Sequence, residues 1–462
     1  MTDAIIIGGG IAGLSAAYRL SLRGIRCRVL EARSRLGGLV GAGSVGGIKI
    51  DLGAESYALR SGEISRLCSE LGLTMNCPQG KSWIYHSGGA TPIAYGIWGI
   101  PVSWDDGAWS ALTGEEYARA RMDENMATDR IGRISTLAEL VRWRCGQAML
   151  EKMVAPMVGS IHSASPEKIG IDAIAPGLRR AIEETGSLIR GVKKLRGTDK
   201  PNLAQPVGGM HVLHETLAEK LRDAGETLTT RMSCEKIIAE PEGGFTVTVR
   251  ETDGRSEDPD RHAAGHTFGA EKVVLATGWK SACRLLRGAF PEAPLDISFP
   301  ADASPVGVTV VLRSRELDCA PRGSGLLVSA DSPLRAKALT HYSEKWKWCG
   351  NRLRALHGPH THALRISYGR AGEEEILPDL PSVLHDASAL LQCTLREEDV
   401  IDFRTVRWGR SLLSHTPQYT ADIARLIEWQ SRIPNFAVTG AWIAGTGLGA
   451  VIPHALTVGS EL

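Results

Sequence analysis

The first 31 residues pass from a short apolar run to a glycine-rich turn, a helix and a second apolar run. Residues 4–7 hold three isoleucines in a row, which is typical of a buried strand, and residues 8–13 hold four glycines. Apolar side chains recur at helical spacing over residues 11–22, and residues 26–31 form a second strand-like run. This order predicts a βαβ unit, and therefore a parallel sheet whose ligand binds at the carboxyl ends of the strands.

The middle of the chain, residues 96–204, has a different pattern. Apolar residues recur there at the spacing of amphipathic helices. The clearest segments are 135–144, 149–158 and 177–189. Ser135 followed by Glu139 is typical of a helix start. We therefore predict a helical insert in this region.

Strand-like runs return after the insert. They cover residues 244–250, 272–276, 307–312, 324–328 and 363–368. Residues 251–267 are polar and charged, so we expect an exposed hairpin loop there. The alternation of helices and strands, together with a length of 462 residues, predicts an α/β chain of two or three domains.

Composition and charge exclude some classes of protein. The 53 basic and 52 acidic side chains nearly balance, which gives no electrostatic case for nucleic acid as a partner. The nine cysteines include no C-x-x-C pair and indicate the reduced thiols of a cytoplasmic protein. Because no run of about 18 apolar residues occurs, no transmembrane helix is predicted, and peripheral membrane contact stays open.

Three neighbouring histidines, His357, His360 and His362, raise the question of a metal ion. Gly358 and Pro359 between them predict a turn, and no carboxylate or thiolate accompanies them in the sequence. We therefore predict a loop and no metal site.

The strongest chemical signal is the spacing Gly8-x-Gly10-x-x-Gly13, which lies between a predicted strand and a predicted helix. Gly8 permits the tight turn, Gly10 lets the backbone approach a pyrophosphate, and Gly13 lets helix and strand pack closely. Glu31 ends the second strand, where a carboxylate accepts hydrogen bonds from a ribose. The spacing predicts a dinucleotide site, although it does not separate NAD from FAD.

The residues after Glu31 extend this motif with two further glycine segments. They are Ala32, Arg35, Gly37 and Gly38, followed by Gly53, Ala54, Glu55 and Ser56. This arrangement resembles the flavoprotein superfamily of monoamine oxidases, carotene desaturases and protoporphyrinogen oxidases. The resemblance implies that the dinucleotide is FAD, with main chain against the pyrophosphate and the flavin ring and with Arg35 near a phosphate.

The second half of the chain is similar to the same superfamily. The segment Ala276, Thr277 and Gly278 resembles the chain crossing at the pyrophosphate. A later segment resembles the one that caps the flavin ring, where a helix N-terminus stabilises negative charge; its residues are Gly440, Gly445, Gly447, Leu448, Val451 and Ile452. The resemblance also places Trp408 in the cofactor site and Cys234 on a strand whose backbone meets the adenine. Taken singly, each segment also fits a buried strand or a glycine turn.

Within the superfamily, several stretches resemble the porphyrinogen oxidases. The most specific are residues 323–328, Lys337-Ala338 and Ser343-x-Lys345-Trp346-x-Trp348. The chain most resembles the bacterial coproporphyrinogen III oxidases, the oxygen-dependent flavoenzymes of Gram-positive haem synthesis. The resemblance implies a six-electron oxidation of coproporphyrinogen III to coproporphyrin III, with three O2 reduced to H2O2. Protoporphyrinogen IX oxidase, an amine oxidase or desaturase, and a non-enzymatic porphyrin carrier are the alternatives.

The fold that this resemblance implies is α/β: a Rossmann-like FAD-binding domain, a mixed-sheet substrate domain and a helical insert, as in monoamine oxidase and p-hydroxybenzoate hydroxylase. The FAD-binding domain is predicted over residues 1–75, 205–285 and 406–462. The substrate-binding domain is predicted over residues 76–95 and 286–405, and a membrane-binding-like helical insert over residues 96–204.

For the propionates of a porphyrinogen, the resemblance favours Arg60, Lys337 and Lys345, with Arg365 as a further choice. Guanidinium groups pair bidentately with carboxylates, whereas lysines act as point charges. Trp346 is a candidate wall for the macrocycle. The alternative interpretation is that the charges are solvated and that the tryptophan packs between domains.

Two residues depart from the family pattern. Trp98 stands where some members place an arginine, and His454 replaces a small residue beside the flavin ring. Residues 179–200 hold seven basic and three acidic side chains, a candidate contact with anionic lipid or the next haem-pathway enzyme, or else a solvated helix face. We expect the protein in the cytoplasm or peripherally at the inner face of the membrane.

Overall fold

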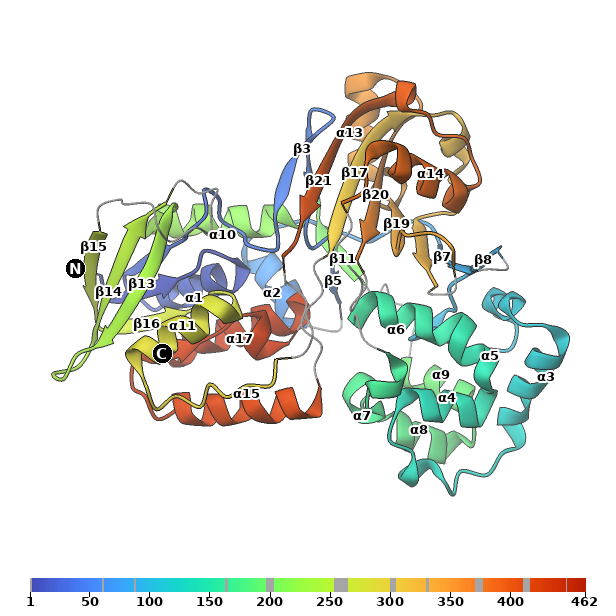
Figure 1. Cartoon of the computed structure of the whole chain (residues 1–462), viewed down its shortest axis with the longest axis horizontal. Helices are drawn as coiled ribbons and strands as arrows, with labels where there is room; N and C mark the ends of the chain where they lie inside the picture. Colours follow the sequence, from blue (N-terminus) through green and yellow to red (C-terminus); the bar gives the residue numbers. More distant parts are fainter. Residues whose placement is uncertain are drawn as a thin grey trace.

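The computed structural model describes residues 2–59, 62–86, 89–162, 165–196, 203–252, 265–299, 305–329, 332–369, 377–409, 416–445 and 447–462. A parallel sheet with its covering helices lies at the end of the molecule that holds the N-terminus (Figure 1). A second, larger sheet and a group of helices form the other end, with the helices drawn in blue-green.

The parallel sheet has five strands in the order β12-β2-β1-β16-β22. Their bounds are Thr227–Thr229, Cys27–Leu30, Ala4–Ile7, Lys272–Leu275 and Phe436–Val438. The predicted βαβ unit is confirmed, because α1 (Ile11–Leu22) joins the parallel neighbours β1 and β2. Every residue of β1 is buried, since helices or a further sheet cover both faces, and this explains its unbroken apolar run.

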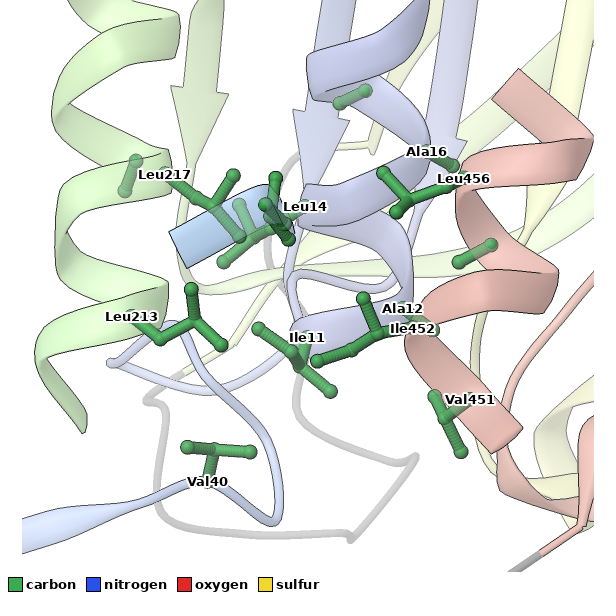
Figure 2. Packing of buried hydrophobic residues seen from close by; sticks show 14 of the residues in the cluster. Ile11, Ala12, Leu14, Ala16, Val40, Leu213, Leu217, Val451, Ile452 and Leu456 are labelled. Carbon is green, nitrogen blue, oxygen red and sulfur yellow. The ribbon is translucent and has the colours of Figure 1, made fainter. Parts of the chain in front are cut away.

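Four helices cover one face of this sheet and share its core. They are α1, α2, α10 and α17, and the last three span Gly62–Glu70, His211–Asp223 and Leu448–Glu461. Figure 2 shows α1 between α10 and α17, with Leu14 toward Leu217 on one side and Ile11 toward Ile452 on the other. The packing fixes the end of the chain against the glycine turn at its beginning.

The opposite face carries an antiparallel sheet and three helices around a second core. The sheet has the order β13-β14-β15, with bounds Met232–Ala239, Phe245–Glu251 and Gly265–Ala270. The helices are α11 (Trp279–Ala289), α15 (Pro417–Gln430) and α16 (Ala441–Ala444). Of the loop expected over residues 251–267, Glu251 ends β14 and 265–267 begin β15, while 253–264 lie outside the described residues.

The larger sheet has seven strands in the order β21-β17-β20-β19-β18-β7-β8. Their bounds are Val400–Arg407, Val306–Arg313, Thr361–Tyr368, Ala338–His341, Gly325–Val328, Ser82–His86 and Gly89–Pro92. The sheet is mixed, as predicted, because β18 and β7 run parallel while the other neighbours run antiparallel.

Different elements cover the two faces of the seven-stranded sheet. Helix α14 (Leu380–Leu391) packs on one face. The other face meets the short helices α12 (Tyr342–Lys345) and α13 (Lys347–His357) and the hairpin β3-β4, which spans Ala42–Val45 and Ile48–Asp51. This hairpin belongs to the N-terminal part of the chain, so the second face is where the two ends of the molecule meet.

Two further small sheets occur, and the labelled strands β5 and β11 of the first lie between the two ends of the molecule (Figure 1). One has the order β5-β11-β6, with bounds Tyr57–Ala58, Leu203–Pro206 and Met75–Asn76. The other pairs β9 (Gly96–Ile97) with β10 (Ile100–Pro101).

The helical group has its own buried core. Its α-helices are α3 to α9, which span Gly114–Arg121, Leu137–Cys145, Gln147–Met149, Ala155–His162, Ile171–Ile174, Leu178–Thr185 and Leu188–Arg196. A π-helical turn, Leu150–Val154, joins α5 to α6. The buried carboxylate of Asp123 ties the group together, because it pairs with buried Arg144 and accepts from the backbone N–H of Leu188, 2.9 Å away, at the start of α9.

Two details of the helix predictions are wrong. The predicted helix over residues 177–189 is two helices, because Gly186 takes a left-handed conformation with φ = 76° and ends α8. The residue that caps α4 is Thr136 and not Ser135, since the Thr136 hydroxyl accepts from the N–H of Glu139. In the described part of the chain, no helix is both long and apolar enough to cross a membrane.

Candidate active site

Two of the three fingerprint glycines are required by close packing. A Cβ at Gly8, where φ is +112°, would lie 2.6 Å from the carbonyl oxygen of Ala276, and one at Gly13 would lie 1.9 Å from that of Gly8. At Gly10 the nearest atom would be the Cα of Gly38, 3.8 Å away. A Cβ at Gly10 would thus make one ordinary van der Waals contact and no close one, so a ligand has room to approach the backbone there.

The second glycine pair lies directly against the first. The N–H of Gly37 donates to the carbonyl of Gly9 over 2.9 Å, and Gly10 and Gly37 form an isolated parallel bridge. Helix α1 begins beside this bridge, and no side chain caps its N-terminus at Gly10. Unpaired N–H groups and the helix dipole together make such an end a favourable place for a phosphate.

Glu31 is held in place by two backbone donors. Its Oε2 accepts from the N–H of Gly9 and its Oε1 from that of Arg33, both over 2.8 Å. A carboxylate offers about four lone-pair positions. Glu31 therefore keeps acceptor capacity for ribose hydroxyls while its own position is fixed. The next residue, Ala32, is exposed, and its carbonyl oxygen accepts a hydrogen bond from the hydroxyl of Thr252.

The carboxyl end of β16 completes this edge of the sheet. The N–H of Ala276 donates to the carbonyl of Ile7 over 2.8 Å, which joins β16 to β1 at the glycine turn. Among the described residues, the buried hydroxyl of Thr277 has no hydrogen-bond partner. Gly278 then starts α11. Unsatisfied buried hydroxyls are uncommon in folded proteins, so Thr277 fits a site that a polar ligand completes.

A second helix N-terminus, that of α17, follows the C-terminal glycines. Gly440, Gly445 and Gly447 have φ values of +122°, +107° and +99°, a conformation that other residues rarely adopt. Helix α17 begins at Leu448, and no side chain caps it. Farther along α17, the side chains of Val451 and Ile452 are buried against α1 (Figure 2), so they help to fix the position of this helix end.

We call the glycine turn 8–13, the pair Gly37-Gly38, Glu31, the end of β16 and the start of α17 together the glycine cradle. Arg35 and Trp408 lie on the side of this cradle that faces the seven-stranded sheet. The Arg35 Nη1 donates to the carbonyl of Gly38 over 3.3 Å, and its guanidinium lies 5.9 Å from the centre of the Trp408 ring. Trp408 is buried and donates from Nε1 to the carbonyl of Leu52 over 3.0 Å. A Cβ at Gly53 would lie 1.9 Å from the carbonyl of Leu39, so only glycine fits there.

Three of the five predicted substrate residues converge on Glu55. Its Oε1 lies 2.7 Å from the Nζ of Lys345 and accepts from Nε1 of Trp346 over 2.9 Å, and its Oε2 lies 3.8 Å from Nη1 of Arg365. Arg365 also donates to the carbonyl of Leu52 over 2.8 Å. Burial acts to raise the pKa of Glu55, but Lys345 and Arg365 outweigh it and hold the pKa below its ordinary value. We call these four residues the Glu55 cluster.

The structure adds a buried carboxylate that the predicted set lacks. Asp51 is fully buried and accepts from the N–H of Met210 over 2.7 Å and of His211 over 2.9 Å, at the start of α10. It also accepts from the hydroxyl of Tyr342 over 3.0 Å. Asp51 thereby connects the hairpin β3-β4 with α10 and α12. The only sequence signal was its place just before Gly53.

The remaining predicted residues lie elsewhere or outside the described part. Arg60 lies outside the described residues. Lys337 donates from Nζ to the carbonyl of Gly369 over 3.2 Å and is not part of the Glu55 cluster. The carbonyl of Cys234 accepts from Arg284 over 2.8 Å, and burial raises the pKa of its thiol to about 12. Ser56 and Ala54 follow the glycine segment and are partly buried.

The two departures from the family pattern make specific contacts. Trp98 lies in the turn between β9 and β10 with φ = 55°, and its Nε1 donates to the carbonyl of Ile174 over 2.9 Å, so its side chain belongs to the helical group. His454 hydrogen-bonds through Nδ1 to the hydroxyl of Thr439 over 2.9 Å, and burial lowers its pKa.

The prediction that no carboxylate accompanies the histidine cluster is wrong. Asp318 contacts both His360, over 2.5 Å, and His362, over 3.1 Å. His362 belongs to β20 and is buried. The pairing was not visible in the sequence, because Asp318 comes from a short helix, Glu316–Cys319, more than forty residues earlier.

Basic residues of α8 and α9 are partly neutralised. Arg180 and Lys194 both pair with Glu184, and Arg179 pairs with Asp172. The described part of the stretch 179–200 ends at Arg196. These ion pairs favour a solvated helix face, whose separate pairs contribute little to stability.

Comparison with known families decides which glycine cradle this is. Residues 11–280, more than half of the chain, match the family model described as flavin containing amine oxidoreductase. The chain belongs to this family. The match covers the fingerprint helix, the second glycine pair, Glu55 and the end of β16, and membership implies FAD as the cofactor.

Relatives of known name match over nearly the whole chain. A protein of Mycobacterium tuberculosis named coproporphyrinogen III oxidase is 27% identical, over 97% of this chain and 94% of its own length. The Bacillus subtilis protein of that name is 25% identical, over 96% and 94%. A solved structure of a putative protoporphyrinogen oxidase from Exiguobacterium superposes with a TM-score of 0.80 at 25% identity, over 100% of this chain and 98% of that one.

Proposed function

We propose that this protein is an oxygen-dependent coproporphyrinogen III oxidase that forms coproporphyrin III. The observation that carries the proposal is the similarity over nearly the full length to relatives of that name, which spans both sheets and the helical group. The reaction removes six electrons and six hydrogens from the porphyrinogen. Three O2 accept them in two-electron steps and leave as three H2O2, so the electrons balance.

FAD bound in the cradle would supply the hydride-accepting ring and its reoxidation by O2. The residues present fit this group, because no atom crowds the position of a Cβ at Gly10 and the Thr277 hydroxyl lacks a partner among the described residues. Gly10 and the start of α1 would hold the pyrophosphate, and Glu31 would hold the ribose. The N-terminus of α17 would lie toward the ring and favour negative charge there.

The Glu55 cluster is proposed to bind propionate. Lys345 and Arg365 carry two positive charges against the single negative charge of Glu55, so one positive charge is uncompensated within the cluster. A propionate of the substrate would balance it through charge-assisted hydrogen bonds. Trp346 is fully buried and donates to Glu55, so its role is to hold this carboxylate in place rather than to wall the macrocycle.

The experiment is an aerobic assay of the FAD-loaded chain with coproporphyrinogen III and protoporphyrinogen IX in parallel. Porphyrin fluorescence and H2O2 are followed together, with buffer plus free FAD as the control for spontaneous oxidation. The proposal predicts faster formation of coproporphyrin than of protoporphyrin, with three H2O2 for each porphyrin. No porphyrin formation above the control by flavin-loaded protein would overturn it.

Protoporphyrinogen IX is the second candidate substrate, favoured by the name of the Exiguobacterium structure. It carries two vinyl groups in place of two propionates, so it needs fewer cationic contacts. A preference for protoporphyrinogen in the same assay would keep the proposed reaction and change its substrate. Contact of the basic stretch 179–200 with the next haem-pathway enzyme or with a membrane surface stays a prediction from the sequence.

A further inference from the structure

A second cluster of reactive side chains lies where β19 and β20 meet α12. His341 at the end of β19 and His362 at the start of β20 are buried, and their rings meet with Nε2 and Nδ1 3.0 Å apart. Glu344 follows His341 by three residues. One ring nitrogen of each histidine and one carboxylate oxygen of Glu344 all lie within 4.8 Å of one another.

The opposite edge of the His362 ring is fixed by a carboxylate. Its Nε2 lies 3.1 Å from Oδ1 of Asp318, and an ionised carboxylate only accepts hydrogen bonds. Nε2 therefore carries the proton, and Nδ1 presents its lone pair toward His341. This carboxylate–histidine arrangement is the one that orients metal-binding histidines in proteins.

His341 turns one ring nitrogen toward His362 and leaves the other without a partner. Its side chain is fully buried, and among the described residues its Nδ1 has no hydrogen-bond partner. Nδ1 can therefore carry the proton of the neutral ring, which leaves the lone pair of Nε2, 3.0 Å from Nδ1 of His362, available to an ion. The ring belongs to the three-residue cluster, so its nitrogen lies near the other two candidate ligands.

Two cations contact the carboxylate of this cluster. The Nζ of Lys347 lies 2.6 Å from Oε2 of Glu344, and Nη1 of Arg354 lies 3.7 Å from Oε1. Half of the Lys347 side chain is exposed to solvent, so it can leave at little cost. The carboxylates of Glu344 and Asp318 balance the two cations, and an incoming ion would compete with Lys347 for Glu344.

We propose that His341, His362 and Glu344 form a binding site for a divalent transition-metal ion of the zinc type. Two imidazole nitrogens and one carboxylate oxygen are a ligand set that Zn²⁺ accepts, with a fourth position left for water. The ion takes the place of the proton between the two rings, and this proton moves from Nε2 to Nδ1 of His341 so that the ring stays neutral. Ligand atoms around tetrahedral Zn²⁺ lie about 3.3 Å apart, so side-chain shifts of about 1 Å close the site.

The site is distinct from the glycine cradle and the Glu55 cluster. His362 and His341 lie on the α14 face, whereas Arg365 lies on the opposite face, toward the hairpin β3-β4. An ion held there would join β19, β20 and α12.

Equilibrium dialysis of the full-length, flavin-loaded chain against Zn²⁺, after treatment with a chelator, tests the proposal. The expected result is one tightly bound Zn²⁺ per chain. His362→Gln and Glu344→Gln should abolish this equivalent or weaken it by more than tenfold, and Asp318→Asn should weaken it roughly ten- to a hundredfold. His385→Ala, which removes an exposed histidine of α14, is the matched control and should leave binding unchanged.

A further variant keeps the test decisive if a buried substitution unfolds the chain. Lys347→Ala removes the competing cation and should tighten Zn²⁺ binding roughly two- to fivefold. Absence of a tight equivalent, or a tight equivalent that survives His362→Gln and Glu344→Gln, would overturn the proposal. The readout is bound metal rather than turnover, so the result stands apart from the outcome of the porphyrinogen assay.

Discussion

The cradle at the parallel sheet and the Glu55 cluster at the seven-stranded sheet are built in opposite ways. The cradle consists of backbone: glycines at three turns, two uncapped helix starts and strand ends, all set by local conformation. The Glu55 cluster consists of side chains that come together over long sequence distances, such as the 291 residues between Glu55 and Trp346. Substitutions in the cradle act through the space that an added Cβ takes, whereas substitutions in the cluster act through the charge that they remove.

This difference determines what a substitution does in each place. In the cradle the decisive quantity is space. A glycine whose Cβ would clash with the chain, such as Gly13, is needed for folding, whereas a glycine whose Cβ would not clash, such as Gly10, is needed only for ligand binding. In the cluster the decisive quantity is charge, because the pKa of Glu55 and the affinity for an anion both depend on Lys345 and Arg365.

The largest effect is expected for Gly13→Ala. Its Cβ would lie 1.9 Å from the carbonyl oxygen of Gly8, so α1 must move away from β1, at a cost of about 4 kcal/mol of unfolding free energy. Thermal unfolding followed by circular dichroism measures it. Gly288→Ala in α11, whose Cβ meets nothing within 4 Å, is the matched control and should stabilise by about 0.5 kcal/mol. Equal melting temperatures for Gly13→Ala and wild type would contradict the account.

Gly10→Ala should separate binding from folding. Because the nearest atom to its Cβ would be 3.8 Å away, the chain should fold with an unchanged melting temperature in the absence of flavin. The added methyl group would fill the space assigned to the pyrophosphate, so FAD affinity should fall about a hundredfold, or 2.7 kcal/mol. Titration of flavin-free protein with FAD measures it, with Gly269→Ala on β15 as the control. An FAD affinity of Gly10→Ala equal to that of wild type would show that the pyrophosphate does not lie beside Gly10.

Removal of a cation from the Glu55 cluster should raise KM. Arg365→Ala and Lys345→Ala each remove a charge-assisted contact to a propionate, so we expect about a tenfold higher KM for coproporphyrinogen III with a smaller change in kcat. Lys337→Ala should have a weaker effect, since Lys337 contacts the carbonyl of Gly369 instead of the cluster. Steady-state porphyrin fluorescence measures both constants. A KM that stays at the wild-type value in both cluster variants would show that the cluster does not bind substrate.

Glu55→Gln should show a smaller, pH-dependent effect on stability. A carboxyl whose pKa is lowered by folding stabilises the folded state above its unfolded pKa, and this contribution disappears as the pH falls through the folded pKa. The variant should therefore be less stable by about 2 kcal/mol at neutral pH, and the gap to wild type should close in acid below the ordinary glutamate pKa. Melting temperatures across that range test the sign. A gap that widens in acid would contradict it.

The contrast also explains how much the sequence could predict. The βαβ unit, the mixed sheet and the helical region follow from local patterns, and the structure confirms them. The convergence of Lys345 and Arg365 on Glu55 could not be predicted, because tertiary packing alone brings β20, α12 and the glycine segment together. The same reason hid the contact of Asp318 with His362. The break at Gly186 was missed because apolar spacing continues across it.

The proposed reaction requires a flavin in this cradle to take electrons from a porphyrinogen held beside the Glu55 cluster. This transfer can be followed by anaerobic mixing of the FAD-loaded chain with coproporphyrinogen III, protoporphyrinogen IX or an alkylamine, through loss of the visible absorption of oxidised flavin. We expect rapid bleaching by coproporphyrinogen III, slower bleaching by protoporphyrinogen IX, and none by the amine. Bleaching by the amine alone would rule out the proposed reaction.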